Sequence, residues 1–587
     1  MERKRKMGKF IIKSLPDMGK ARNRVDNPKI IEDEVKVGPF LSSFAKGRFY
    51  LIKTFGCQAN VRDEEVLSGY LEKAGFKKTL DDSKANLVII NTCAVRENAE
   101  EKVYGEIGKF KINKTKDPDF ILCVCGCMMQ EENAASYIMK TYPHVSLVFG
   151  THNVSKILDL LEEKLKSKKK IIDVVSFAGD VVENLPSVRL DPYKAFVNIT
   201  YGCDKFCTYC IVPYTRGRER SRKLDEILAE CKKLVDEGYQ EITLLGQNVN
   251  SYGKDFHDGT NFAKVLEEVA KLNVPRLRFM TSHPWDFSND MLEVIAKYPN
   301  IMKCIHLPVQ SGSTSVLRLM GRRYTREEYL SLVDRIRKVI PGVALTTDII
   351  VGFPNESEEQ FEDTLSLCKE VNYDAAFTFI YSPRKGTPAA KMIDNVSSST
   401  KHERFNRLVK VIEESVSSHA EKMVGKVYKV LVDGPSKKDK NVLSGYTESS
   451  KLVNFKGPSY LKGHIVNVLI KESHTYSLIG ELVDDPLLIM AADLSKSLND
   501  EDLSKNYFAA LSSFENNENL KELKKQIDLK QKELVNLSFN SDVDLNKEKI
   551  ELDKLREKYE KDPCYLNLKS AIEELKPLLA EVANFIK

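Results

Sequence analysis

The chain has 587 residues, a formal net charge of +5 at pH 7, 42% hydrophobic residues and 30% charged residues. This length excludes a single small binding module, and the ordinary composition excludes a disordered or fibrous protein. We find no stretch of about 18 apolar residues, so we expect no membrane span and a cytoplasmic protein. We see no secretory signal, so we expect the thiols of the 12 cysteines to be reduced. Reduced cysteines are either core residues or metal ligands.

The net charge is unevenly distributed. Residues 486–587 carry a net charge of about −4, which leaves about +9 for residues 1–485. A basic body fits an anionic partner such as RNA, although a solvated charged surface explains the same numbers.

The first part of the chain has an α/β pattern. Residues 1–46 are basic and irregular, and we expect a flexible arm. Buried strands, separated by amphipathic helices, are then expected at 48–55, 87–91, 120–124 and 147–149. Strands that alternate with helices predict a parallel-sheet domain over 48–150, and residues 151–187 are expected to form a Lys-rich helix and a linker.

A second α/β pattern spans residues 189–421. Its expected strands are 195–200, 241–245, 276–280, 305–307, 344–351 and 375–381. Six βα units predict a partial (βα)6 barrel, in which functional residues lie at the carboxyl ends of the strands.

The last two segments differ from the first two. Residues 422–485 contain short alternating strands broken by Gly and Ser, which predict a small β-barrel. Residues 486–587 are rich in Lys, Glu and Leu and predict three or four helices or a coiled-coil hairpin. The expected fold class is therefore multidomain, with a parallel-sheet α/β domain, a partial barrel, a small β-barrel and an all-α extension.

Three cysteines follow the first strand of the expected barrel. Cys203, Cys207 and Cys210 form C-x3-C-x2-C within TYGCDKFCTYC. On one short loop they can bind three irons of a [4Fe–4S] cluster and leave the fourth iron open. A zinc site usually needs a fourth Cys or His nearby, and this loop supplies none. The spacing therefore predicts an open-iron cluster.

Three more cysteines follow successive strands of the first domain. Cys57, Cys93 and Cys127 lie in TFGCQAN, NTCAV and GCMMQ. The carboxyl ends of neighbouring parallel strands meet at one edge of a sheet, so these thiols predict a second cluster. Cys123 and Cys125 share a face with Cys127 by the two-residue period of a strand, and the pattern alone leaves all three as candidates.

These motifs resemble the radical S-adenosyl-L-methionine (SAM) enzymes and, among them, the MiaB-type tRNA methylthiotransferases. The order of 48–150, 189–421 and 422–485 is similar to the cluster domain, radical SAM barrel and TRAM domain of that family. The GCMMQ motif of the family selects Cys127. The resemblance implies two [4Fe–4S] clusters, an auxiliary one at Cys57, Cys93 and Cys127 and one at Cys203, Cys207 and Cys210 that binds SAM.

The resemblance also implies contacts with SAM. Tyr209 precedes the last cysteine of the loop and is expected near the adenine. Further cofactor contacts are expected after the next strands, at Gly246, Gln247, Asn248, Ser282, Gln310 and Asp348. One such residue alone is more often a turn or a cap, but their placement at successive strand ends favours a cofactor cleft.

Basic and aromatic residues are candidate tRNA contacts. Arg216, Arg218 and Arg220 follow the cluster loop and suit phosphates, although pairing with carboxylates that brace the loop explains them equally well. Tyr381 ends the last barrel strand, and Lys426 and Lys429 lie in the TRAM-like segment, where a solvated surface is the alternative.

The activity that the resemblance implies is methylthiolation of C2 of N6-isopentenyladenosine at position 37, in the anticodon stem-loop of tRNA. No catalytic residue beyond the clusters and SAM is expected, and the reductant would be flavodoxin or ferredoxin, with the sulfur donor unknown. The alternatives are threonylcarbamoyladenosine tRNA or a ribosomal protein Asp as substrate, or a non-catalytic iron–sulfur RNA-binding protein.

The tail resembles a different family. Residues 486–587 are similar to the helical YlbF/YmcA proteins in their short acidic helices and their long Lys/Glu/Leu helix. This resemblance implies a protein partner that binds residues 490–587, and a plain helical appendage is the alternative.

Overall fold

The computed structural model describes residues 10–17, 19, 29–94, 97–131, 133–176, 180–537 and 545–586. The chain divides into two compact units, Met1–Val483 and Asp484–Lys587. Within the described residues, no helix combines the length and the apolar character that crossing a membrane requires.

The N-terminal domain is built on a seven-stranded parallel sheet in the order β1-β8-β7-β6-β5-β3-β4. The strands are β1 (Phe10–Ser14), β3 (Phe49–Thr54), β4 (Lys77–Lys78), β5 (Leu87–Thr92), β6 (Ile121–Gly126), β7 (Leu147–Phe149) and β8 (Lys170–Asp173). The four strands predicted between residues 48 and 150 are all present, within two residues at each end.

Two segments differ from their predicted structure. β1 comes from the segment expected to be a flexible arm, and it pairs in parallel with β8, which comes from the expected helix and linker. β2 (Ile30–Glu32) likewise pairs with β9 (Val181–Glu183). These strands are short and lie among lysines, so their local pattern is weak, and only pairing between distant segments makes them strands. The basic residues 1–9 of the arm lie outside the described residues.

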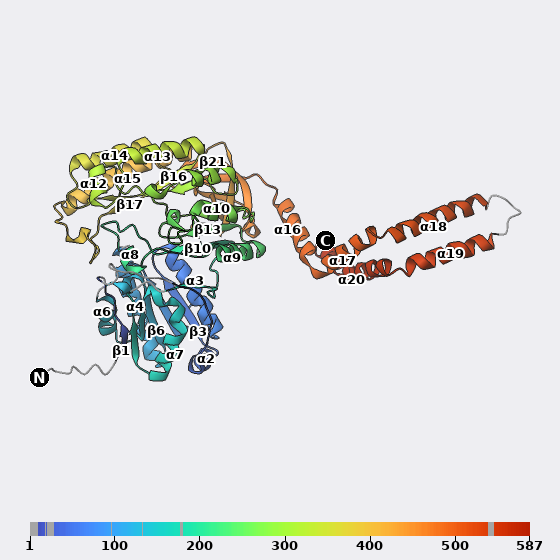
Figure 1. Cartoon of the computed structure of the whole chain (residues 1–587), viewed down its shortest axis with the longest axis horizontal. Coiled ribbons are helices and arrows are strands. Elements are labelled where there is room, and N and C mark those ends of the chain that lie inside the picture. The colour runs from blue at the N-terminus through green and yellow to red at the C-terminus, as the bar shows by residue number, and fades with distance from the viewer. Residues whose placement is uncertain are drawn as a thin grey trace. The chain divides into compact units, whose positions relative to one another are not determined.

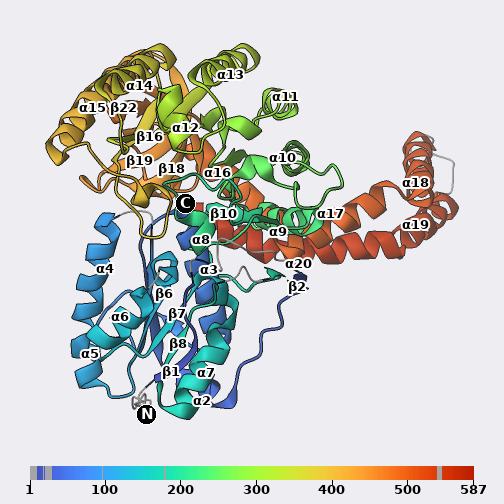
Figure 2. The ribbon, with the colours of Figure 1, turned by 60° about the vertical axis from the view of Figure 1, so that its left-hand side comes forward.

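Helices cover both faces of this sheet (Figure 2). One face packs on α2 (Pro39–Ala45), α3 (Gln58–Lys73) and α7 (Ile157–Ser167), and the other on α4 (Glu97–Lys109) and α6 (Ala134–Thr141). The short helix α5 (Lys111–Lys116) follows α4 and has no buried residue. Every residue of β5 and β6 is buried, as expected for central strands of a parallel sheet. Because helices cover both faces, functional side chains can gather at the carboxyl edge of the sheet.

The barrel contains the six predicted parallel strands. They are β10 (Lys194–Asn198), β13 (Glu241–Leu245), β14 (Arg276–Phe279), β15 (Cys304–His306), β16 (Ala344–Val351) and β17 (Ala375–Ile380). A bridge between Leu277 and Ile301 joins the two runs of three strands. Outside them lie α9 (Leu224–Asp236), α10 (Phe262–Ala270), α11 (Asn289–Lys297), α13 (Arg326–Val339), α14 (Glu358–Val371) and α15 (Ser398–Glu421).

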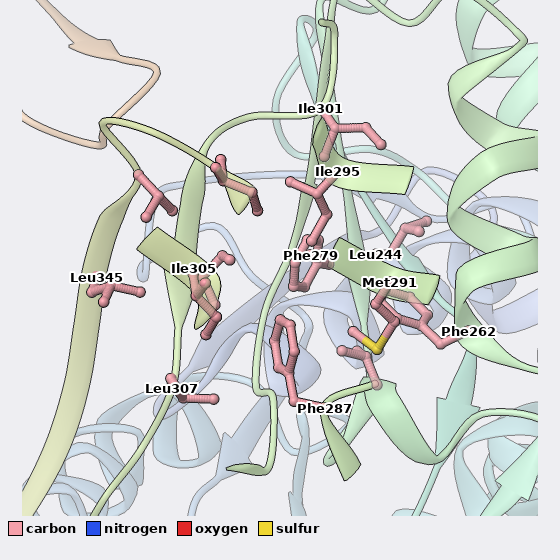
Figure 3. Close-up of a cluster of buried hydrophobic side chains, with 14 of the residues drawn as sticks. Leu244, Phe262, Phe279, Phe287, Met291, Ile295, Ile301, Ile305, Leu307 and Leu345 are labelled. Carbon is pink, nitrogen blue, oxygen red and sulfur yellow. The ribbon is translucent and has the colours of Figure 1, made fainter. Parts of the chain in front are cut away.

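The barrel core is dominated by aromatic and aliphatic side chains. In Figure 3, Phe279 and Phe287 lie between Ile305 on one side and Met291 on the other, and all four are buried. The rings of Phe262 and Phe279 meet edge to face, with centroids 5.4 Å apart. This packing fixes the strands whose ends carry the predicted site.

A closed five-stranded barrel follows, as predicted. It contains β18 (Val427–Pro435), β19 (Val442–Thr447), β20 (Leu452–Lys456), β21 (Ile465–His474) and β22 (Ser477–Leu482). Arg276, the first residue of β14, donates hydrogen bonds to the carbonyl oxygens of Tyr446 and Thr447, both at 2.8 Å. Lys451 donates to the carbonyl oxygen of Asp374, just before β17, at 2.7 Å. The small barrel thus packs against the amino ends of the large barrel's strands.

The second unit is helical, as predicted. The described helices are α16 (Pro486–Asp500), α17 (Asp502–Glu515), α18 (Glu518–Leu537), α19 (Asn546–Glu560) and α20 (Pro563–Ile586), which exceed the three or four expected. α18 lies beside α19, where Lys530 pairs with Glu548 and Glu551, and α17 packs on α20 (Figure 1).

Candidate functional site

The first cysteine set lies at the carboxyl edge of three neighbouring strands. Cys57 is the N-cap of α3, Cys93 directly follows β5, and Cys127 directly follows β6. The strands that precede them, β3, β5 and β6, are adjacent and paired in register. The three cysteines therefore lie at one edge of the sheet.

Two glycines allow this convergence. Gly56 has φ +117°, and a Cβ added there would lie 2.6 Å from the Cβ of Cys93. Gly126 has φ +99°, and a Cβ there would lie 2.3 Å from the carbonyl oxygen of Thr92. Only glycine adopts this backbone and allows this approach without strain, so the glycines set the distance between the cysteine loops.

The structure distinguishes among the three cysteines of the third strand. Cys123 is buried in the hydrophobic core of the sheet domain, and Cys125 lies against Asn91, 3.9 Å from its Oδ1. Because Gly126 ends the strand, Cys127 begins a 3-10 helix and lies instead with Ala94 and Ile211. Its position beside the other cysteine loops supports Cys127 as the third ligand.

The second cysteine set lies on a loop that is fixed at both ends. β11 (Thr200–Tyr201) pairs with β12 (Arg220–Ser221) at its base. At its far side Thr208 donates hydrogen bonds to the carbonyl oxygens of Met320 (2.9 Å) and Leu319 (2.8 Å), at the end of α12 (Thr314–Leu319). The loop is therefore anchored to the barrel at its base and at its far side.

One cavity of about 1950 Å³ joins the two cysteine sets. Five of the six cysteines line it, namely Cys57, Cys93, Cys203, Cys207 and Cys210, and Cys127 lies behind this wall. The cavity also contains every predicted SAM contact: Tyr209, Gly246, Gln247, Asn248, Ser282, Gln310 and Asp348. Small-molecule sites usually enclose about 300–1000 Å³, so this cavity has room for a cofactor together with part of a larger substrate.

Polar atoms in the cavity wall lack partners. Within the described residues, Asn248 Oδ1, Ser282 Oγ and Tyr381 Oη are buried and make no hydrogen bond. Buried polar atoms are nearly always hydrogen-bonded, so these three atoms indicate a polar ligand.

The donor set fits iron–sulfur clusters. Burial raises the pKa of Cys127 and of Cys210 to about 12, so these buried thiols need bound cations to become thiolates. In the described ranges no three His, Cys, Asp or Glu side chains converge on one metal ion. The cysteines of a [4Fe–4S] cluster each bind a different iron, so a set of three thiols is the donor set that leaves one iron open.

The predicted tRNA-binding residues differ in their partners, in their exposure and in whether they line the cavity. Arg216 is paired inside the protein, where its Nη2 donates to Asn60 Oδ1 (2.6 Å) and Asp63 Oδ2 (2.7 Å), and this pairing supports the bracing alternative. Arg220 is buried beside the Tyr201 ring and also lines the cavity. Arg218, Lys426 and Lys429 do not line the cavity, and the side chain of Arg218 is 42% exposed in a pair with Asp204.

Sequence reasoning missed two charged residues, Arg322 in the cavity wall and Asp286 in contact with it. Arg322 is buried, and its Nη1 lies 3.8 Å from Cys207 Sγ. Asp286 accepts from Lys205 (2.5 Å) and Lys254 (2.6 Å) and from Asn248 (2.7 Å). Burial opposes the charge of Asp286, but the two lysines outweigh it and hold the pKa of that carboxyl well below its usual range. No local motif marks either residue, because their partners come from distant loops.

A buried ion network joins the sheet domain to the barrel. Glu230 of α9 accepts from Arg62 of α3 (3.0 Å), Arg189 of the connecting segment (2.6 Å) and Arg222 (2.6 Å). Arg222 also pairs with Glu183 of β9, and Arg189 with Glu65 of α3. This network sets how the two cysteine edges face each other across the cavity.

Four family models match the chain. They are the uncharacterized protein family UPF0004 at residues 49–150, the Radical SAM superfamily at 197–368, the TRAM domain at 421–483, and the control of competence regulator ComK, YlbF/YmcA, at 487–587.

Curated relatives match over most of the chain. The tRNA-2-methylthio-N(6)-dimethylallyladenosine synthase of Bacillus licheniformis is 51% identical over 80% of this chain and 93% of its own length. The Staphylococcus haemolyticus protein of the same name is 52% identical over 81% and 93%. The chain belongs to the radical SAM tRNA methylthiotransferase family.

Membership of the methylthiotransferase family confirms several predictions. The enzyme class, the multidomain fold, tRNA as substrate, and SAM with [4Fe–4S] clusters as cofactors are as the motifs implied. Among solved structures, the radical SAM methyltransferase TsrM from Kitasatospora setae is similar at 14% identity and a TM-score of 0.46, over 59% of this chain and 75% of that one.

Proposed function

We propose that the protein is a tRNA-2-methylthio-N6-dimethylallyladenosine synthase, which methylthiolates C2 of N6-isopentenyladenosine at position 37 of the anticodon stem-loop. One observation carries this proposal: five cysteines from two domains line a single cavity, and the sixth lies directly behind its wall. Transfer of sulfur to a carbon centre requires the radical source and the sulfur source to face one substrate atom. A redox or RNA-binding protein needs no such shared cavity.

The residues of the chain have separate tasks in this proposal. Cys203, Cys207 and Cys210 would hold the SAM-binding cluster, and Cys57, Cys93 and Cys127 the auxiliary cluster. When bound, the clusters and SAM supply the radical, sulfur and methyl chemistry that no protein side chain provides. The unpartnered Asn248 Oδ1 would accept a hydrogen bond from SAM, Ser282 Oγ would donate or accept one, and Tyr381 Oη would meet the substrate.

Single-stranded loops are the part of an RNA whose bases are free to leave the stack. The target adenine of the anticodon loop would turn out into the cavity, whose volume of about 1950 Å³ accommodates it beside SAM. Apolar side chains such as Phe377 and Ile380 in the cavity wall would exclude water from the reacting centre.

The decisive experiment is nucleoside mass spectrometry of tRNA that carries N6-isopentenyladenosine, after anaerobic incubation with reduced, reconstituted protein and SAM. We expect the 2-methylthio nucleoside as product. Formation of the 2-methylthio product only on threonylcarbamoyladenosine tRNA, or only on a ribosomal protein Asp, would refute the substrate.

Paired cysteine variants test the division of labour. Cys203→Ala should abolish SAM cleavage, whereas Cys57→Ala should retain cleavage and lose sulfur insertion. Each should lose about half of the roughly eight irons expected for two clusters. Cys231→Ala, a buried cysteine of α9 outside the cavity, is the matched control and should retain all iron. Intact SAM with both clusters present and reduced would contradict the enzyme proposal.

Two further assignments complete the proposal. An electron donor such as flavodoxin or ferredoxin would reduce the cluster, and the protein would act in the cytoplasm, where its tRNA substrate is found. We also propose that Lys426 and Lys429 track the tRNA backbone from the exposed surface of the TRAM barrel.

A further inference from the structure

The only tryptophan of the chain is exposed beside the radical SAM loop. Trp285 follows β14, lies in the 3-10 helix Pro284–Asp286 and is 47% exposed. Its main chain is fixed, because its N–H donates to the Nδ1 of His283, a residue of the cavity wall. A rigidly placed, half-exposed indole at the carboxyl end of a barrel strand is not needed for the core, so its exposure requires another explanation.

Cations surround this indole. The Nζ of Lys205 lies 5.5 Å from the ring centroid, and the Cζ of Arg323 lies 5.0 Å from it. Lys205 belongs to the cluster loop and Arg323 to the segment between α12 and α13, so two distant segments converge on one ring. Both cations lie over the ring, so a base that replaced one of them would stack on the indole with the displaced cation beside its phosphate.

A second cavity adjoins the main cavity and is lined by both cations that lie over the indole. Its volume is about 450 Å³, and it is lined by Lys205, Phe206, Thr314, Arg318, Gly321, Arg322, Arg323, Tyr324, Thr325 and Glu328. Lys205 and Arg322 also line the main cavity, so the two spaces share a wall. A nucleotide in the second cavity would be a near neighbour of a base in the first.

The two outer arginines are available for phosphate. Arg318 and Arg323 are exposed, and neither forms an ion pair with any described residue. The acidic groups nearby are engaged: Asp286 holds Lys205 and Lys254, and Glu328 accepts from the N–H of Thr325 in a capping box. The second cavity therefore presents net positive charge next to an aromatic ring.

We infer that Trp285, with Lys205, Arg318 and Arg323, is a stacking site for an anticodon-loop nucleotide that neighbours the modified adenosine. The indole binds the base by stacking, and the arginines bind the adjoining phosphates. This inference rests on the proposed function, since it assigns a second contact to the same RNA. The site would hold the loop open while the target base occupies the main cavity.

The test measures the affinity of anaerobic holoenzyme for a fluorescently labelled anticodon stem-loop that carries N6-isopentenyladenosine, by anisotropy. Trp285→Ala should weaken binding about 5- to 150-fold, the loss expected for one stacked base. Trp285→Phe should retain part of the affinity. Arg323→Ala should lower the slope of log affinity against log salt by about 0.7, the value for one phosphate of a single strand.

Phe40→Ala is the matched control. Phe40 is also exposed, at 54%, and also has a lysine over its ring, Lys166 at 5.5 Å, but it lies on α2, far in the fold from the cavity wall. The Phe40→Ala variant should bind RNA with the affinity of the wild type. Far-UV circular dichroism and iron content report whether each variant is folded.

The single tryptophan provides an independent signal. RNA should quench the emission of the wild-type holoenzyme, because Trp285 is its one indole. An affinity of Trp285→Ala within twofold of Phe40→Ala, or unchanged emission at saturating RNA, would overturn the inference. If Trp285→Ala does not fold, Arg323→Ala decides the question, and a salt slope equal to that of Phe40→Ala would overturn the inference. Failure of the wild type to methylthiolate tRNA would instead refute the proposed function, so the two failures are distinct.

Discussion

The ion network between the sheet domain and the barrel makes a quantitative prediction for Glu230→Gln. Glu230 accepts hydrogen bonds from three arginines, and its side chain is 18% exposed. The substitution keeps the size of the side chain and removes its charge. It leaves Arg62, Arg189 and Arg222 with two carboxylates, Glu65 and Glu183, to share.

The magnitude follows from the pKa. Burial alone would raise the pKa of Glu230, but the three arginines lower it from 4.5 to about 2. This lowering of the Glu230 pKa corresponds to about 3 kcal/mol of folding free energy. The value lies within the range measured when one partner of a buried ion pair is removed. Because the folded pKa lies below the unfolded value, this stabilisation is complete above about pH 4.5 and is lost as the pH falls toward 2.

Urea unfolding of the anaerobic holoprotein, followed by far-UV circular dichroism, checks this value. With a slope of about 3 kcal/mol per M, Glu230→Gln should lower the midpoint of the first unit by about 1 M, equally at pH 6 and pH 8. Glu226→Gln, on the same helix and outside the network, should cost less than about 1 kcal/mol. Equal midpoints for the two variants would refute the reasoning.

Three further predictions concern the site and the TRAM barrel. Gly126→Ala should lose about half of the iron, measured by chemical analysis, because its Cβ would lie 2.3 Å from the carbonyl oxygen of Thr92 and displace Cys127; full iron content would contradict this. Arg276→Ala should speed hydrogen exchange of β19, since it removes both hydrogen bonds to Tyr446 and Thr447, while exchange in β6 stays the same. The double variant Lys426→Ala, Lys429→Ala should reduce the salt dependence of tRNA binding by about 1.5 in slope; an unchanged slope would place the phosphate contacts elsewhere.

The sequence by itself predicted the strands that carry the site. β13, β16 and β7 begin and end where the pattern of apolar residues placed them. Central strands of a parallel sheet are buried on both faces, so their sequence is a nearly continuous apolar run that is visible without any partner. Cys93 and Cys127 directly follow two such buried strands, β5 and β6, so their position at strand ends was determined locally.

Other features depended on partners that are distant in the sequence. β1 pairs with β8 across about 160 residues, and β8 pairs on its other side with β7; the short runs of β1 and β8 among lysines gave no local signal. The two-residue period of a strand left Cys123, Cys125 and Cys127 open, and only the resemblance selected Cys127; the turn at Gly126 supplies the physical reason, because the period cannot show where the strand ends.

The charged residues show the same limit most clearly. The sequence left Arg216 equally suited to phosphate and to a carboxylate, and the tertiary structure paired it with Asn60 and Asp63 of α3. Arg322 and Trp285 carry no motif, yet one lies beside Cys207 and the other at the edge of the cavity. Residue type and spacing determined the chemistry of this protein, whereas the partners of its charges were decided by folding, because electrostatic contacts depend on distance in space and not on separation along the chain.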